Sequence, residues 1–305
     1  MVFVAPTMML RYVRPALFIL LGSLIGACSP LTTFDRLVPK DRGGERVATD
    51  LAYGPDARQR LDVYAPQGKC TAPRPVVAFF YGGSWNSGTR RGYAFVGRAL
   101  AARGFVTVVP DYRLVPEVRY PAFVEDGATA VRWAAEHAGA YCGDGRSIVL
   151  MGHSAGAYIA AMLAVDPRWL KDARSAVKGL VGLAGPYDFA PFDVEASRAA
   201  FGQAPNPADT QPVTFAGAGD PPALLLYGTA DTVVLPRNSE ALAARLRAGG
   251  AAADTRAYPK LGHVGIVLAL ARPFRGRAPV LDDISTFVRQ VTHGVPGTGV
   301  VHGTE

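Results

Sequence analysis

The fold is decided by the stretch Ser147-Ile148-Val149-Leu150-Met151-Gly152-His153-Ser154-Ala155-Gly156. Its apolar part has the length of a buried strand, and an alanine-rich helical pattern begins directly after the motif Gly-x-Ser-x-Gly. A serine between a strand and a helix occupies a sharp turn, and Gly152 and Gly156 leave room for the two elements to approach. The sequence therefore predicts Ser154 as a nucleophile exposed above a sheet.

Short apolar runs alternate with helical patterns along most of the 305 residues. The apolar runs of strand length cover residues 76–81, 106–109, 148–151, 180–184 and 223–227, with a weaker one at 255–258, and two alternating segments at 47–53 and 60–64 precede them. This alternation predicts an α/β fold with a mostly parallel central sheet of about eight strands and helices on both faces. We expect residues 46–292 to form this one domain, with residues 185–222 as a small cap or lid segment beside the site.

An acid and a histidine follow the serine in the order Ser, Asp, His. Asp231 lies one short loop after the strand at 223–227, and His263 follows the last predicted strand. A serine needs a base to take its proton, and the base needs a third group to orient it, so Ser154, His263 and Asp231 are the predicted catalytic residues. Asp188 is an alternative acid, and His153 is expected to be packed rather than catalytic.

The segment Tyr81-Gly82-Gly83-Ser84-Trp85 follows another predicted strand. Attack on a carbonyl creates an oxyanion, which needs hydrogen-bond donors already in place. The amides of Gly83, Ser84 and Ala155 are the predicted donors, with Trp85 as the anchor of the loop. A plain hairpin turn is the alternative interpretation of the two glycines.

The first 28 residues resemble a bacterial lipoprotein signal, because Arg11 and Arg14 precede a short apolar stretch that ends in Ile-Gly-Ala-Cys. Cys28 would then be acylated and attach an exported protein to the membrane, in the periplasm or at the outer membrane. An ordinary cleaved signal or an uncleaved anchor is the alternative. Residues 29–45 are expected to be a tether, and residues 293–305 a loose tail.

The formal net charge of +7 does not indicate a nucleic-acid partner, because the cations are scattered and no basic run is interleaved with aromatic residues. Cys70 and Cys142 would remain in an oxidising compartment. No Cys-x-x-Cys motif or cluster of paired ligands is present in the sequence, so we expect no metal or redox site and no cofactor.

Together these motifs resemble the α/β-hydrolase esterases, including the hormone-sensitive-lipase-like carboxylesterases, the kynurenine formamidases and the feruloyl or acetyl-xylan-esterase-like enzymes. The resemblance covers about residues 47–290 and is carried by residues 81–85, 111–117, 152–156, Asp231 and Gly262-His263. Tyr81 departs from the histidine that these families usually have before the two glycines. The resemblance implies that Asp111, Arg113 and Asp126 are structural residues beneath the site.

The same resemblance implies a serine hydrolase that cleaves carboxylic esters of small molecules through an acyl-enzyme. An arylformamidase or peptidase with the same triad is the alternative, and a non-catalytic binding module a remote one. In that fold the strands at 76–81 and 148–151 are parallel neighbours, which implies a disulfide between Cys70 and Cys142. The long N-terminal cap of the hormone-sensitive-lipase-like enzymes is missing, so we expect short acyl groups or bulky alcohols.

Overall fold

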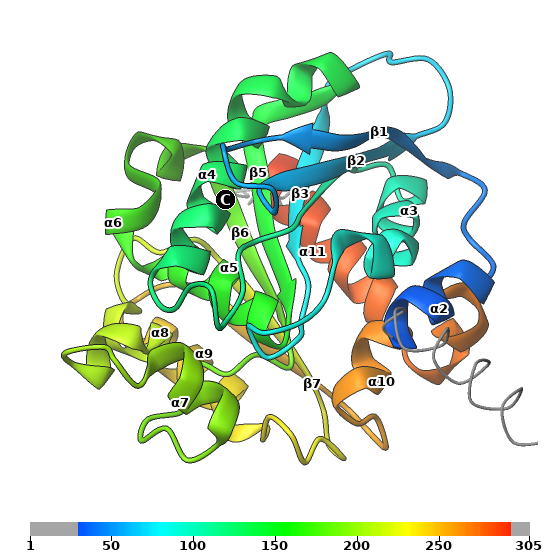
Figure 1. The fold of residues 1–305 in the computed structure, drawn as a ribbon. Helices are drawn as coiled ribbons and strands as arrows, with labels where there is room; N and C mark the ends of the chain where they lie inside the picture. The colour runs from blue at the N-terminus through cyan, green and yellow to red at the C-terminus, as the bar shows by residue number, and fades with distance from the viewer. Residues whose placement is uncertain (1–29, 294–305) are drawn as a thin grey trace, which may run out of the picture.

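An eight-stranded, mostly parallel sheet forms the centre of the protein, as the sequence predicts (Figure 1). The computed structural model describes residues 30–293. The strands are β1 (Gly44–Ala52), β2 (Arg60–Pro66), β3 (Arg74–Phe80), β4 (Val106–Pro110), β5 (Gly143–His153), β6 (Val177–Leu183), β7 (Ala223–Gly228) and β8 (Ala253–Tyr258). Their order is β1-β2-β4-β3-β5-β6-β7-β8. β2 runs antiparallel to β1 and β4, and the remaining neighbours are parallel.

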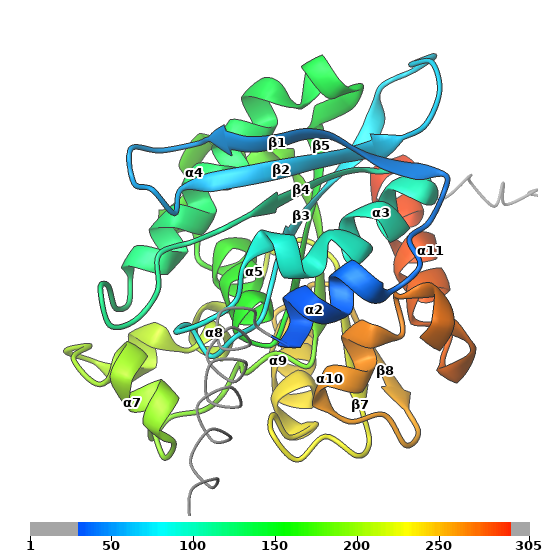
Figure 2. The ribbon, with the colours of Figure 1, turned by 45° about the vertical axis from the view of Figure 1, so that its right-hand side comes forward.

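Helices cover both faces of this sheet (Figures 1 and 2). They are α2 (Pro30–Leu37), α3 (Ala94–Ala102), α4 (Ala122–His137), α5 (Ala155–Val165), α6 (Pro167–Leu170), α7 (Glu195–Phe201), α8 (Pro212–Phe215), α9 (Arg237–Ala248), α10 (His263–Leu268) and α11 (Val280–His293). α3 and α11 pack on one face, and α4, α5 and α9 on the other. Within residues 30–293, no helix is long and apolar enough to cross a membrane.

The helix that follows the nucleophile motif is buried along its whole length. Every residue of α5 is buried, and its many alanines let it lie close against β3, β5 and β6. A Cβ atom on Gly156 would lie 2.1 Å from the carbonyl oxygen of Phe80, and one on Gly152 would lie 2.2 Å from the carbonyl oxygen of Gly156. Only glycine fits at these two positions, so the sharp turn at Ser154 is fixed by steric contacts.

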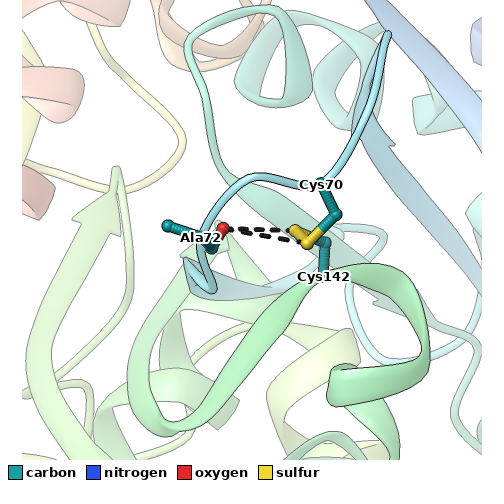
Figure 3. Close-up of a disulfide and its surroundings, with 3 residues drawn as sticks. All are labelled: Cys70, Ala72 and Cys142. Carbon is teal, nitrogen blue, oxygen red and sulfur yellow. Dashed lines mark hydrogen bonds between the residues drawn. A yellow bond between two sulfur atoms is a disulfide. The ribbon is translucent and has the colours of Figure 1, made fainter.

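A disulfide joins Cys70 and Cys142, whose Cα atoms are 5.7 Å apart (Figure 3). Cys70 lies just before β3 and Cys142 directly before β5, and these strands pair in parallel from Arg74 and Gly143 onward. The disulfide therefore lies at the amino ends of the two strands, at the opposite end of β5 from Ser154.

The N-terminal segment differs from the expected tether. Residues from Pro30 onward form α2, whose Phe34 ring packs edge-on against Phe95 with 5.4 Å between the ring centroids. The buried carboxylate of Asp35 accepts a hydrogen bond of 2.7 Å from the Phe95 amide. The physical reason is the helical spacing of Leu31 and Phe34, continued by Val38 directly after the helix, which places apolar side chains against the domain. The predicted signal with Cys28 and nearly all of the predicted tail lie outside the described residues.

Candidate active site

Three side chains from three loops meet at the carboxyl edge of the sheet. Oγ of Ser154 lies 2.8 Å from Nε2 of His263, and Nδ1 of the same ring lies 2.8 Å from Oδ2 of Asp231. Ser154 follows β5, Asp231 follows β7 and His263 begins α10 after β8. The imidazole is thus placed to accept the serine proton while the carboxylate holds its other nitrogen.

The serine occupies a strained backbone position. Ser154 has φ 54° and ψ −124°, and its amide donates a hydrogen bond of 2.9 Å to the Leu183 carbonyl at the end of β6. Positive φ is unfavourable for a residue with a Cβ atom, and the crowding at the neighbouring glycines holds the turn in place. This conformation directs the hydroxyl away from the strand, into the space that the histidine shares.

Asp231 is held by more than the histidine. Its side chain is buried, and Oδ1 accepts hydrogen bonds of 2.9 Å from the amides of Val233 and Val234. The alternative acid, Asp188, lies instead along the wall of a cleft, where its amide donates to Oδ1 of Asn238 at 3.0 Å. The carboxylate that the structure pairs with His263 is therefore Asp231.

The neighbouring His153 contacts the backbone of His263. This residue is 4% exposed, and its Nε2 lies 3.0 Å from the carbonyl oxygen of His263. Since a carbonyl only accepts, Nε2 carries the proton. Burial, with the nearby His263 ring as a second cause, lowers the pKa of His153 to about 3, so the ring is neutral at ordinary pH. The sequence predicted that His153 packs, but its hydrogen bond to His263 spans 110 residues and left no local signal.

The loop after β3 contains a run of residues with positive φ. The values are 140° at Gly83, 51° at Ser84 and 58° at Trp85. The Gly83 carbonyl accepts hydrogen bonds of 3.0 Å from the amides of Asn86 and Ser87, which closes a tight turn. The loop is therefore a compact turn beside the serine rather than a hairpin between two strands.

Two of the three predicted amide donors belong to residues that line the cleft at Ser154. Ser84 and Ala155 line the cleft together with Ser154, and Gly83 lies one residue before this lining. Ala155 is the first residue of α5, so its amide lies at the positive end of the helix dipole. The side chain of Trp85 is buried and packs edge-on against Phe201 at 4.8 Å, which anchors the loop.

A clamp of polar side chains holds both ends of this loop. The Tyr81 hydroxyl donates to Oδ1 of Asp111 at 2.8 Å, and the Tyr112 hydroxyl donates to the Tyr81 carbonyl at 2.8 Å. Nη2 of Arg58 donates to the Tyr81 hydroxyl at 3.0 Å and to the Gly88 carbonyl at 3.1 Å. Burial and the Asp111 charge raise the pKa of Tyr81 well above its usual value, so the phenol stays protonated as a donor.

Buried ion pairs support the clamp from below. The Arg90 guanidinium pairs with Asp111, and its Nε donates to Asp62 at 2.8 Å. Arg113 pairs with Asp126 at 2.7 Å. None of these charged groups lines the cleft at Ser154, in keeping with the structural role that the resemblance implies for Asp111, Arg113 and Asp126. Within residues 30–293, no group of three or more His, Cys, Asp or Glu side chains could hold a metal ion.

A cleft of about 300 Å³ opens above Ser154. The expected cap segment forms one wall with Phe189, Pro191 and Val194, and the loop after Asp231 forms the other. Gln211 fixes the cap wall, because its Oε1 accepts hydrogen bonds from the amides of Phe189 and Ala190 at 2.7 and 3.2 Å. The exposed lining of the cleft is mostly apolar, and the cleft is open to solvent.

Comparison with known proteins shows the family of this chain. The family model BD-FAE matches residues 61–246, which is more than half of the chain. The chain belongs to the BD-FAE family. Esterase LipC of Mycobacterium tuberculosis is 31% identical over 265 residues, covering 79% of this chain and 64% of LipC. Isoprenylcysteine alpha-carbonyl methylesterase ICME of Arabidopsis thaliana is 29% identical over 271 residues, covering 80% of this chain and 62% of that protein.

Solved structures show the same fold for this BD-FAE chain. A truncated form of a carbohydrate esterase from gut microbiota superposes with a TM-score of 0.73 at 22% identity, covering 84% of this chain and 99% of that one. The α/β-hydrolase fold predicted from the sequence is therefore confirmed. The chain spans somewhat less than two thirds of the length of the two curated relatives.

Proposed function

We propose that this protein is a serine hydrolase that cleaves carboxylic esters through an acyl-enzyme. Ser154 attacks the ester carbonyl while Nε2 of His263 accepts the hydroxyl proton, and Asp231 stabilises the imidazolium that forms. The amides of Ala155, Gly83 and Ser84 donate hydrogen bonds to the new oxyanion. The imidazolium then donates its proton to the leaving alcohol as the carbon–oxygen bond breaks.

The second half of the reaction uses the same groups with water in place of the alcohol. His263 accepts a proton from the water, whose oxygen attacks the acyl carbon, and the same amides hold the second oxyanion. When this intermediate collapses, the proton returns to Ser154 and the carboxylic acid leaves. No other group in the cleft is needed for either half.

One observation carries this proposal. The contacts from Ser154 to His263 and from His263 to Asp231, both 2.8 Å, end at a hydroxyl that opens into an apolar cleft. The two curated relatives described above, an esterase and a methylesterase, support an ester as the bond that is cleaved.

A fluorophosphonate probe tests the nucleophile. We expect stoichiometric labelling of the full chain on Ser154, no labelling of Ser154→Ala, and hydrolysis of p-nitrophenyl butyrate by the wild type alone. Labelling without turnover of any ester, together with turnover of formamides or peptides, would instead assign the same triad to amide bonds. Absence of labelling would contradict the proposal altogether.

We also propose a preference for acyl groups of two to four carbons, on a bulky alcohol. The cleft volume is about 300 Å³, and the exposed side chains of Val194, Val233 and Leu235 stand at its rim. A longer chain would leave its outer methylenes in water and lose the roughly 0.8 kcal/mol that burial of each would contribute. A p-nitrophenyl ester series measures this, and kcat/KM rising steadily to ten carbons or more would contradict it.

We propose further that the protein is exported and anchored through an acylated Cys28. The signal-like sequence before this residue supports export, and so does the disulfide between Cys70 and Cys142, which is typical of an oxidising compartment. Intact-mass analysis of the protein extracted from bacterial membranes should show an acylated N-terminal cysteine. A soluble product cleaved at another position would contradict the anchor.

A further inference from the structure

A second cavity, lined mainly by cations, lies between α2, β1 and α3. Its volume is about 440 Å³, and it shares no lining residue with the cleft at Ser154. Its cationic lining residues are Arg36, Lys40, Arg46, Arg91 and Arg98, and its only lining carboxylate is Asp35. A concave site with this excess of positive charge concentrates anions.

The carboxylates near this cavity are already engaged. Asp35 accepts a hydrogen bond of 2.7 Å from the Phe95 amide and pairs with Lys40 at 3.4 Å. Arg46 pairs with Asp62 at 3.3 Å, but the carboxylate of Asp62 also forms an ion pair with the buried Arg90. Within residues 30–293, these carboxylates pair with Lys40, Arg46 and Arg90, and with neither Arg91 nor Arg98.

Two arginines of the cavity keep their charge available for a ligand. Arg91 is exposed, and Arg98 is half-buried with its Nη1 donating to the Gly44 carbonyl at 2.9 Å. Among residues 30–293, neither forms an ion pair with a carboxylate. Guanidinium groups bind phosphate oxygens through paired hydrogen bonds, so a phosphate suits these two arginines.

We propose that this cavity binds the phosphodiester headgroup of an anionic phospholipid. α2 and α3 lie side by side at the surface (Figure 2), and Thr32 of the cavity wall is near the start of α2 at Pro30. Two residues reach at most about 7 Å, so an anchor at Cys28 would hold this start close to the bilayer surface. Leu37, on the same helix, is 79% exposed and suits an interface with lipid.

Headgroup binding is tested with the full chain in a neutral detergent. Isothermal titration calorimetry at fixed ionic strength compares three probes: glycerophosphoglycerol, glycerophosphocholine and inorganic phosphate. We expect glycerophosphoglycerol to bind and glycerophosphocholine, whose cationic end meets the arginines, to bind at least about tenfold more weakly. Arg91→Glu should weaken glycerophosphoglycerol at least about tenfold, because a charge-assisted hydrogen bond is lost and a repulsive charge gained.

The matched control is Arg245→Glu. Arg245 is exposed on α9, which packs on β7 and β8 at the opposite end of the sheet from β1, and its replacement makes the same change in net charge. This variant should bind the headgroup like the wild type. An equal loss in both variants would show a diffuse field rather than a site, and binding of inorganic phosphate without glycerophosphoglycerol would exclude the headgroup. Either result overturns the proposal, and neither depends on ester hydrolysis.

Discussion

Replacing Asp231 by asparagine tests how the histidine is oriented. In the wild type, Oδ1 of Asp231 accepts two backbone amides at 2.9 Å, and Oδ2 lies 2.8 Å from Nδ1 of His263. An asparagine can satisfy those amides only with its carbonyl oxygen, so its NH₂ group must face Nδ1. Nδ1 then has to accept, the ring proton moves to Nε2, and Nε2 can no longer take the proton of Ser154.

The expected loss of kcat is large because His263 stays in place but can no longer act as a base. By analogy with other serine triads, kcat should fall about 10⁴-fold, which corresponds to about 5.5 kcal/mol of transition-state stabilisation. KM should change little, because the side chain of Asp231 is buried behind His263. The fold should persist, since asparagine has nearly the same volume and keeps both hydrogen bonds from the backbone.

The assay is initial-rate kinetics on p-nitrophenyl butyrate, with thermal unfolding as the check on folding. Asp188→Asn is the matched control, because Asp188 lines the cleft but does not contact Nδ1 of His263, which pairs with Asp231. We expect its kcat to stay within about threefold of the wild type. A loss below tenfold in Asp231→Asn, or a greater loss in Asp188→Asn, would refute this assignment of the acid.

Three further predictions concern the disulfide and the residues that support the site. Replacing Cys70 and Cys142 by serine opens a loop of 72 residues and should lower the free energy of unfolding by about 4 kcal/mol in urea titration, with kcat nearly unchanged. Tyr81→Phe should lower kcat about tenfold and leave KM within about twofold, because the loop donors act on the oxyanion formed during the reaction. His153→Leu should lower kcat about tenfold through a loosened His263, and His153→Gln, which retains a donor, should restore most of it.

Each of these predictions has an outcome that contradicts it. A denaturant midpoint unchanged by the serine pair would mean that the disulfide does not constrain the unfolded chain. Tyr258→Phe is the control for Tyr81→Phe, because it removes a comparable hydrogen bond to Asp283. An equal fall in kcat in the two variants would assign the effect to general destabilisation. The pKa of His153 is lowered, so the unfolded chain binds more protons and the wild type loses stability as the pH falls below about 6.5. If the melting temperature of His153→Gln fell as steeply with decreasing pH as that of the wild type, the lowered pKa of His153 would not be the cause.

The sheet and the triad could be predicted because their signals are local. The central strands are apolar runs, and the serine, acid and histidine each follow a strand directly or after a short loop. Boundaries were harder, since β5 starts at Gly143, five residues before the apolar run at 148–151. Gly143 and Asp144 extend the strand because they pair with Arg74 and Pro75 of β3, and such pairing leaves no trace in the local sequence.

The polar support of the site could not be predicted for the same reason. Arg58, Tyr81 and Asp111 come from three separate segments, and a single arginine in a polar loop has no periodicity to mark it. The substitution of tyrosine for the usual histidine showed only that the support differs. Its new partners became visible once the fold had brought the segments together. α2 is a different case, because its apolar spacing was present in the sequence and was outweighed by its many polar residues.

The strained backbone around the cleft explains why so much buried structure surrounds a few reacting atoms. Ser84, Trp85 and Ser154 all have positive φ, and each such residue costs on the order of 1–3 kcal/mol. The burial of Trp85 and the clamp at Tyr81 offset this free-energy cost during folding. The donors therefore need no rearrangement when an oxyanion forms. Weakening the clamp should let the loop relax toward ordinary backbone angles. The rate would then fall before the stability of the whole domain does, because the eight-stranded sheet and its packed helices do not depend on the loop.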